Sequence, residues 1–206
     1  MGGTLQVTGI PFVLTPSPGT AWAVDGNTVT VRATPHSDIF IDPGGDTQAN
    51  AETQLNAATL LGAVPSGDFQ LSARVSVGFA DTFDAGVLML WLDERHWGKL
   101  CFEFSPDREP MVVSVVARGV ADDANAFVVD GDAIWLRLSR VGQVFSYHAS
   151  TDGSTWRMVR AFALDSPGTV VRVGFEAQSP MGDGCDVAFH HVAFSSTTLA
   201  NLRDGS

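Results

Sequence analysis

The chain has 206 residues, 45% of them hydrophobic, and 23 acidic against 12 basic side chains give it a formal net charge of −11. This length and composition predict one domain over residues 1–206, with its core at about 10–195 and a polar tail at 197–206 that frays. No cluster of Lys and Arg offsets the acidic charge, so nucleic-acid partners are disfavoured.

The sequence also bears on location. The amino terminus has no basic region followed by an apolar run, and no window of about 18 apolar residues occurs later, so we expect a cytoplasmic protein without membrane partners. Cys101 lies among apolar neighbours and Cys185 follows a turn. We therefore expect both thiols to be buried and reduced rather than bridged.

Nearly every segment after residue 27 reads as a strand bounded by turn residues. Short alternating stretches occur at 27–33 and 38–42, and a loop rich in Gly, Asp and Asn follows at 43–50. Residues 51–61 have a helix-forming composition without an amphipathic pattern. They fit either a helix or a loop followed by a short strand.

The middle of the chain carries the clearest strand patterns. Residues 69–79 alternate apolar with polar side chains, whereas 85–92 are apolar on both faces, as in a central strand between two layers. Further strands are expected at 97–104, 111–118, 126–129, 134–140, 143–150, 155–164, 170–179 and 185–194.

Turn signals recur every 8–12 residues or so, and no helical crossover separates any two of these strands. Short connections at 141–142 and 151–154 predict tight hairpins, and in the second of them we expect Trp156 to restart the next strand against the core. The fold class is therefore all-β, an antiparallel sandwich of two sheets. Its predicted core includes Val75, Val77, Leu88, Leu90, Leu100, Phe102, Val113, Val115, Leu136 and Phe175.

Residues 96–104 carry the most informative alternation. Trp97, Lys99, Cys101 and Glu103 share one face of this strand, and the other face is apolar. A Trp beside a Lys and a Glu suits a sugar-binding surface, which combines an aromatic platform with charged hydrogen-bonding groups.

Other strands have similarly polar second faces, which would converge if they belong to one concave sheet. We therefore predict a ligand groove formed by Trp97, Lys99, Glu103, Trp135, Arg137, Glu176, Gln178, Asp38 and Asp42. The alternative is that these charges only form salt bridges on a solvated sheet face.

Several motifs occur in a fixed order along the chain. They are Asp38–Pro43, Asp84–Gly86, Trp97–Glu103, Ser114–Val116, Asp122–Asp123, Ser150–Trp156 and Gly174–Pro180. From about residue 10 to 195, this set resembles the domain of unknown function family numbered 1349, which includes regulation-of-enolase-type proteins. That family is similar to the concanavalin A-like lectin/glucanase superfamily. The resemblance implies a jelly roll and a carbohydrate or sugar-derived ligand.

Two other functions remain open. Glu103 and Glu176 could form the acid/base pair of a glycan hydrolase if their carboxyl groups lie about 5–9 Å apart. However, laminarinase-like members of the superfamily carry a Glu-x-Asp-x-x-Glu motif, and residues 93–96, Asp-Glu-Arg-His, break it. The resemblance also suggests a regulatory protein-interaction module acting on carbohydrate metabolism, which would need an exposed apolar patch and a protein partner.

No metal or cofactor is expected. Acidic residues sit beside turns at 81–84, 122–125 and 183–186, but none has the spacing of a calcium loop, so a structural Ca²⁺ is not favoured. The five histidines lack metal-ligand spacing, and His190 and His191 should point to opposite faces of a strand. Nucleotide-binding and acyl-transfer motifs are also missing from the sequence.

Overall fold

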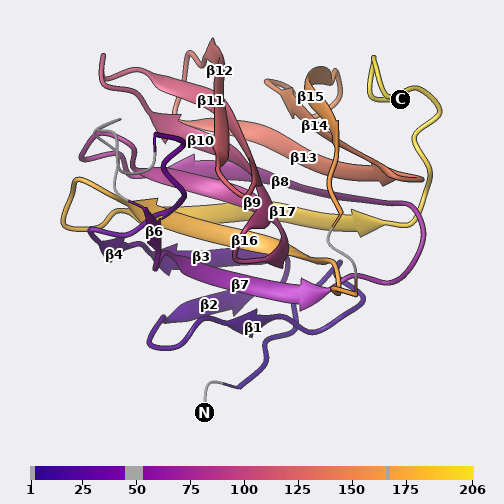
Figure 1. Cartoon of the computed structure of the whole chain (residues 1–206), viewed down its shortest axis with the longest axis horizontal. Coiled ribbons are helices and arrows are strands. Elements are labelled where there is room, and N and C mark those ends of the chain that lie inside the picture. Colours follow the sequence, from indigo (N-terminus) through magenta and orange to yellow (C-terminus); the bar gives the residue numbers. More distant parts are fainter. Residues whose placement is uncertain (1–2, 45–52, 166–167) are drawn as a thin grey trace.

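The computed structural model describes residues 3–44, 53–165 and 168–206. In these parts the chain forms β-strands joined by turns, without helices, and two large sheets pack face to face (Figure 1). Most of the loop predicted at 43–50 lies outside the described residues. Where the chain is described, no helical segment has the length and apolar character needed to span a bilayer.

The first sheet has eight strands in the order β1-β7-β16-β9-β10-β11-β12, and β4 pairs with β16 as its one parallel neighbour. Its strands are β1 (Thr15–Pro16), β4 (Thr34–Pro35), β7 (Ala58–Ala63), β9 (Ala85–Asp93), β10 (His96–Phe104), β11 (Pro110–Arg118), β12 (Ala121–Val128) and β16 (Arg172–Ser179).

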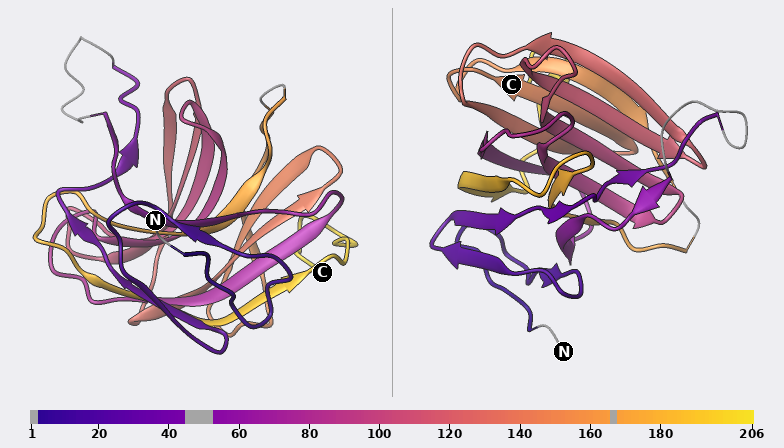
Figure 2. Two further views of the ribbon diagram at one scale, coloured as in Figure 1. Left: turned by 90° about the horizontal axis from the view of Figure 1, so that it is seen from below. Right: turned by 90° about the vertical axis from the view of Figure 1, so that its left-hand side faces the viewer.

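The second sheet has seven antiparallel strands in the order β15-β14-β13-β8-β17-β3-β2. They are β2 (Trp22–Asp25), β3 (Thr28–Arg32), β8 (Phe69–Val77), β13 (Ala133–Val141), β14 (Val144–Ser150), β15 (Arg157–Ala163) and β17 (Asp186–Ser195). The short strands β5 (Ile39–Phe40) and β6 (Gln54–Leu55) pair with each other outside both sheets (Figure 2). The chain passes repeatedly from one sheet to the other, as in a jelly roll.

Both faces of the first sheet are buried. Its inner face packs against the second sheet, and strict alternation on β8 supplies side chains such as Leu71 and Val75 to that core. A second apolar cluster, with Met89, Trp97 and Val113 among its members, covers the outer face. All ten predicted core residues are buried, although Val113 and Val115 belong to the outer cluster.

The predicted strands are confirmed with small shifts at their ends. For residues 51–61, where helix and strand were both open, the described part contains β6 and the start of β7. The sequence patterns missed β1, β2 and β4, which have two to four residues each, and they started β12 at 126 instead of 121. Strands this short contain too few residues for a period of two to be recognised. Cys101 and Cys185 are free and buried, as predicted.

Two predictions about β17 and the tail are wrong. A register shift between His190 and Ala193, with a positive φ of 52° at His191, brings both histidines to the outer face, where His191 stacks on Trp135. Such a bulge breaks the alternation of a regular strand. The tail does not fray, because Leu199 is only 6% exposed and polar groups of the second sheet bind the backbone at 202–205.

We expect Gly86→Ala to destabilise the fold strongly. A Cβ at Gly86 would lie 2.6 Å from Cγ1 of Val75 and 2.7 Å from Cγ1 of Val187, so the two sheets would have to move apart. The cost should be roughly 1–3 kcal/mol. At Gly78 the nearest atom to an added Cβ is the carbonyl oxygen of Asp186 at 3.6 Å, which makes Gly78→Ala the matched control. Thermal unfolding of both variants measures the difference, and equal midpoints would contradict this account of the packing.

Candidate functional site

Buried polar side chains gather on the outer face of the first sheet. Alternation places Lys99 and Glu103 of β10 on this face, as predicted, and Glu176 and Gln178 of β16 join them across β9. Asp38, just before β5, approaches from above the sheet. We call these five residues the Lys99 cluster.

Lys99 is the single lysine of the chain and is 2% exposed. Its Nζ donates hydrogen bonds to Oδ1 of Asp38 and to Oε1 of Gln178, both at 2.8 Å. The Nε2 of Gln178 donates to the carbonyl oxygen of Phe83 at 3.1 Å, which fixes the orientation of the amide. Burial opposes the charge of the ammonium group, but the carboxylates of Asp38 and Glu176 outweigh it and raise the pKa of Lys99.

Glu176 has no hydrogen-bond partner for either carboxylate oxygen, although its side chain is fully buried. Burial raises the pKa of Glu176 to about 8, against the lowering effect of Lys99. A buried polar group without a partner costs free energy in a folded protein. Nε1 of Trp97 on the same face is also buried without a partner, so this face holds unused donors and acceptors.

Glu103 is the second carboxyl group with a strongly shifted pKa. Burial raises the pKa of Glu103 to about 8, with Lys99 acting against the shift and the charge of Asp123 adding to it. Glu103 and Glu176 are not on neighbouring strands, because β9 lies between β10 and β16. Glu176 is level with Cys101, two residues from Glu103, so two strand spacings across the sheet and two residues along it separate the two backbones by roughly 12 Å.

The aromatic side chains differ from the sequence prediction. Trp97 is 0% exposed, so its ring offers no face to a sugar in this structure, and its predicted role as a platform is wrong. Trp91 of β9 is half-buried on the same face, paired with Trp97 on one side and Arg172 on the other. Trp91 is not among the predicted site residues, because residues 85–92 are apolar on both faces and offered no polar second face. Counting in twos from Val87 and Met89 would have placed it here.

Three other predicted site residues lie elsewhere. Trp135 and Arg137 belong to β13 of the second sheet, so they cannot share a groove with the Lys99 cluster, and this part of the prediction is wrong. Asp42 is close to Asp38 in sequence, but its Oδ1 accepts a hydrogen bond from the backbone of Gly44 at 2.7 Å. Asp42 therefore supports its own turn.

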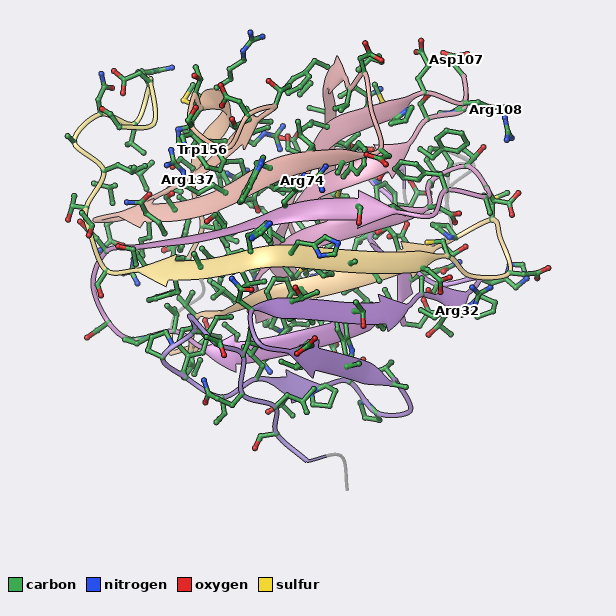
Figure 3. All side chains as sticks on the ribbon, turned by 180° about the vertical axis from the view of Figure 1, so that it is seen from behind. Arg32, Arg74, Asp107, Arg108, Arg137 and Trp156 are labelled. Atoms are coloured by element: carbon green, nitrogen blue, oxygen red, sulfur yellow. The ribbon has the colours of Figure 1, made fainter. Side chains whose placement is uncertain are left out.

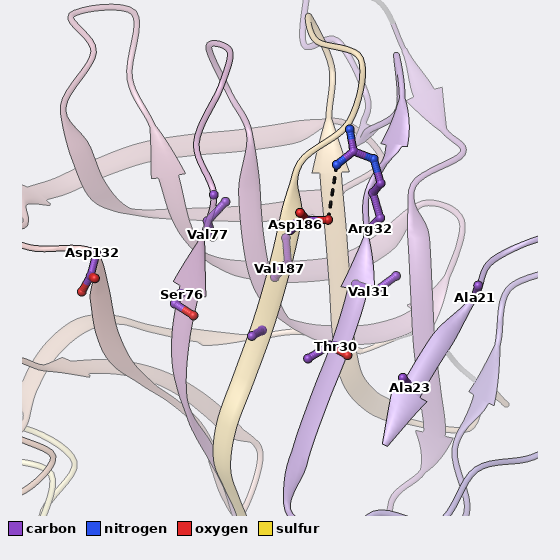
Figure 4. A pocket seen from close by; sticks show the side chains of 12 residues that line it. Ala21, Ala23, Thr30, Val31, Arg32, Ser76, Val77, Asp132, Asp186 and Val187 are labelled. Carbon is purple, nitrogen blue, oxygen red and sulfur yellow. Dashed lines mark hydrogen bonds and ion pairs between the residues drawn. The ribbon is translucent and has the colours of Figure 1, made fainter. Parts of the chain in front are cut away.

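Surface cavities lie on both sheets of the described part of the chain. One of about 530 Å³ lies over β2, β3, β8 and β17 on the outer face of the second sheet, beside the exposed ion pair of Arg32 and Asp186 (Figure 4). The other, of about 650 Å³, lies at the β7 side of the first sheet, where Thr59 and Arg172 line it. Thr59 is the register partner of Glu176, so this second cavity borders the Lys99 cluster.

An acidic side chain at one of the acidic turns, Asp84, accepts hydrogen bonds from the backbone. Oδ2 of Asp84 accepts hydrogen bonds from the backbone N–H groups of Ala80 and Asp81, and its Oδ1 accepts one from Ser179. In the described parts of the chain, no three His, Cys, Asp or Glu side chains are grouped so that they could hold a metal ion.

Comparison with known proteins gives the family and the fold. Residues 15–197 match the family described as "Protein of unknown function (DUF1349)". A curated relative from Saccharomyces cerevisiae, "Regulation of enolase protein 1", is 30% identical over 146 residues, which cover 70% of this chain and 72% of the relative.

Among solved structures, a functionally unknown protein from Saccharomyces cerevisiae has a TM-score of 0.78 and 22% identity, over 90% of this chain and 97% of that one. The carbohydrate-binding module CBM66 from Bacillus subtilis has a TM-score of 0.54 and 15% identity, over 93% and 99%. The GH43 protein BlXynB from Bacillus licheniformis has a TM-score of 0.68 and 12% identity, and this chain covers only 35% of it. The chain belongs to the DUF1349 family, and its fold is a β-sandwich of two antiparallel sheets that is similar to the folds of a carbohydrate-binding module and of part of a GH43 protein.

Proposed function

We propose that the protein binds a carbohydrate-related ligand on the outer face of its first sheet. The observation that carries this proposal is the fully buried carboxyl group of Glu176, whose two oxygens lack hydrogen-bond partners beside the lysine of the cluster. Sugar hydroxyl groups both donate and accept hydrogen bonds, so they can satisfy such a carboxyl group and its neighbours.

The cavity at β7 supports a binding site on this same face of the first sheet. Thr59 and Arg172 line it, and Trp91 lies next to Arg172 on the neighbouring strand. The half-buried indole of Trp91 beside the guanidinium group of Arg172 combines apolar ring surface with a polar contact, which is what a sugar ring requires. The ligand would bind along Arg172 and Trp91, and because Glu176 is 0% exposed, the ligand's hydroxyl groups reach this carboxyl group only when the side chains above it move.

Binding to a glycan panel, followed by calorimetry with any glycan that binds, tests the proposal. We expect Trp91→Ala to weaken binding by about 1 kcal/mol or more, because the apolar ring surface that contacts the ligand is lost. Trp135→Ala removes an indole from the other sheet and should leave the affinity unchanged. Equal effects of the two substitutions would contradict the proposed face.

A second candidate function is glycan hydrolysis, in which Glu103 and Glu176 carry the chemistry. The raised pKa values of about 8 for both groups favour it, because a general acid must keep its proton near neutral pH. The backbones of Glu103 and Glu176 are roughly 12 Å apart, which is wider than the carboxyl separation of either a retaining or an inverting pair, and this separation weighs against the hydrolase.

The substitution Glu103→Gln separates binding from hydrolysis. A binding protein should lose roughly 1–3 kcal/mol of affinity when this anchor changes. A hydrolase should keep its affinity for the glycan and lose turnover by a factor of about 10² or more. Calorimetry and a reducing-sugar assay on the same sample distinguish the two results.

We also propose a cytoplasmic location and a single domain over residues 1–206.

A regulatory protein-interaction module would need an exposed apolar patch. Large exposed apolar side chains do occur among the described residues, in different loops and strands. They are Val13, Leu55, Phe83, Val120, Val128, Val170 and Met181.

A further inference from the structure

A second buried polar patch lies on the outer face of the seven-stranded sheet, opposite the proposed carbohydrate face. Arg137 and Ser139 of β13 face outward beside His148 and Ser146 of β14, to which they are paired in register. Arg137 is 7% exposed and the other three are 0% or nearly so. Residues 201–206, which we call the strap, contact the Arg137 and His148 end of this patch.

Arg137 is a buried cation without an anionic partner. Its Nη2 donates to the carbonyl oxygen of Gly205 at 2.6 Å, and its Nε has no partner. The guanidinium carbon lies 4.2 Å from the ring centroid of Trp156 (Figure 3). None of the ion pairs found between described residues includes Arg137, and burial lowers the pKa of its guanidinium group to about 10. Trp156 therefore faces this patch instead of the core, contrary to the sequence prediction.

Three more polar atoms of the patch are buried without partners. His148 donates from Nε2 to the carbonyl oxygen of Leu202 at 2.8 Å, and burial lowers the pKa of the ring, so its free Nδ1 is an acceptor. The hydroxyl groups of Ser139 and Ser146 are the other two. The patch thus offers a ligand one cation, one acceptor, two hydroxyl groups and the nearby ring of Trp156.

The strap is held together mainly by its own contacts. The backbone N–H of Gly205 donates to the carbonyl oxygen of Asn201 at 2.9 Å, and Nδ2 of Asn201 donates to Asp204 at 2.8 Å. The carboxylate of Asp204 also accepts from the backbone of Ser206 and is not paired with Arg137. Once the carbonyl contacts of Gly205 and Leu202 break, the strap can leave the sheet, and its short internal turn, no longer supported by the sheet, then exchanges its backbone N–H groups with water.

We propose that this patch is a binding site for a hydroxylated carboxylate of the acidic-sugar type, and that the strap covers it in the absence of ligand. The carboxylate would replace the carbonyl oxygen of Gly205 on Arg137, because a guanidinium group binds a carboxylate through two parallel hydrogen bonds. The ligand's hydroxyl groups would bind His148 and the two serines. This site is on the other sheet from the Lys99 cluster and does not depend on the function proposed there.

The substitution Gly205→Val tests the proposal by lifting the strap. Gly205 has a φ of +76°, and an added Cβ would contact Arg137, lie 2.8 Å from Cβ of Trp156 and 3.1 Å from His148. Gly19 has nearly the same φ, +81°, and no atom within 4 Å of an added Cβ, so Gly19→Val is the matched control. It introduces the same backbone strain without touching the patch.

Calorimetry with glucuronate, and with glucose as the neutral probe, measures the effect. We expect Gly205→Val to bind glucuronate about tenfold or more tighter than the wild type and Gly19→Val, because the competing strap has been removed. Adding Arg137→Gln to Gly205→Val should abolish this gain in affinity, and the affinity for glucose should be the same in all of the proteins. Equal glucuronate affinities with and without the strap, survival of the gain in the double variant, or an equal gain for glucose would each overturn the proposal.

A measurement on the unaltered protein decides the matter if Gly205→Val does not fold. Hydrogen exchange at the backbone N–H of Gly205 reports whether the strap is closed, since this group is hydrogen-bonded within it. Saturating glucuronate should accelerate exchange in the strap and leave β13 unchanged. If exchange in the strap is the same with glucuronate and with glucose, the site does not exist.

Discussion

Lys99→Met should unfold the protein more readily than any other single change on the outer face of the first sheet, with a loss of about 3–5 kcal/mol at pH 9. The substitution removes the cation that Asp38 and Gln178 contact at 2.8 Å and that offsets the charges of Glu103 and Glu176. At pH 5 both glutamates carry protons in the wild type, so the loss should be smaller. Urea unfolding at the two pH values measures both losses.

Arg32→Met is the matched control for this prediction. Arg32 also pairs with an aspartate, at 3.3 Å from Asp186, but the two side chains are 60% and 80% exposed. An exposed pair contributes little to stability, about 0–1 kcal/mol. Comparable losses for Lys99→Met and Arg32→Met would mean that water reaches Lys99 and that the cluster is not buried.

Glu176→Gln should make the protein more stable at alkaline pH. The pKa of Glu176 rises from 4.5 to about 8 on folding, so between these values the folded state binds more protons than the unfolded state. The free energy of unfolding therefore falls as the pH rises from about 4.5 to 8. Glutamine cannot ionise, so the variant avoids this loss and should exceed the wild type by on the order of 2–4 kcal/mol at pH 9.

The two proteins should have similar stability at pH 4, where Glu176 carries a proton in both the folded and the unfolded state. Glu94→Gln changes an exposed glutamate at the turn after β9 and should follow the wild-type curve throughout. Thermal unfolding from pH 4 to pH 9 supplies all three curves. Parallel curves for wild type and Glu176→Gln would show that the pKa of Glu176 is not raised.

The comparison of Glu176 with Glu103 also bears on the proposed function. Both carboxyl groups have a pKa of about 8, but only Glu176 is completely enclosed without a hydrogen-bond partner. A ligand that supplies hydroxyl groups to Glu176 should therefore bind with a stabilising effect that grows with pH. In a thermal-shift screen, such a ligand should therefore raise the unfolding temperature more at pH 8 than at pH 6.

The polarity pattern of single strands could be read from the sequence. Alternation on β10 placed Trp97, Lys99 and Glu103 on one face because successive side chains of a strand point in opposite directions. The apolar run 85–92 similarly identified a strand buried on both faces, and short turns identified the hairpins β13–β14 and β14–β15. These features depend only on neighbouring residues, and the order of motifs along the chain was enough to indicate the family.

Only the tertiary structure decided which of these faces meet. Nothing in the local pattern of β13 reveals that Trp135 and Arg137 belong to the other sheet, since strand order depends on contacts between residues far apart in sequence. Burial of Trp97 and enclosure of Glu176 likewise result from packing above the sheet, which the alternation within β10 or β16 does not encode. The bulge at His191 and the docking of residues 201–206 on Arg137 and His148 have the same origin, because long-range contacts there outweigh the local preferences of the chain.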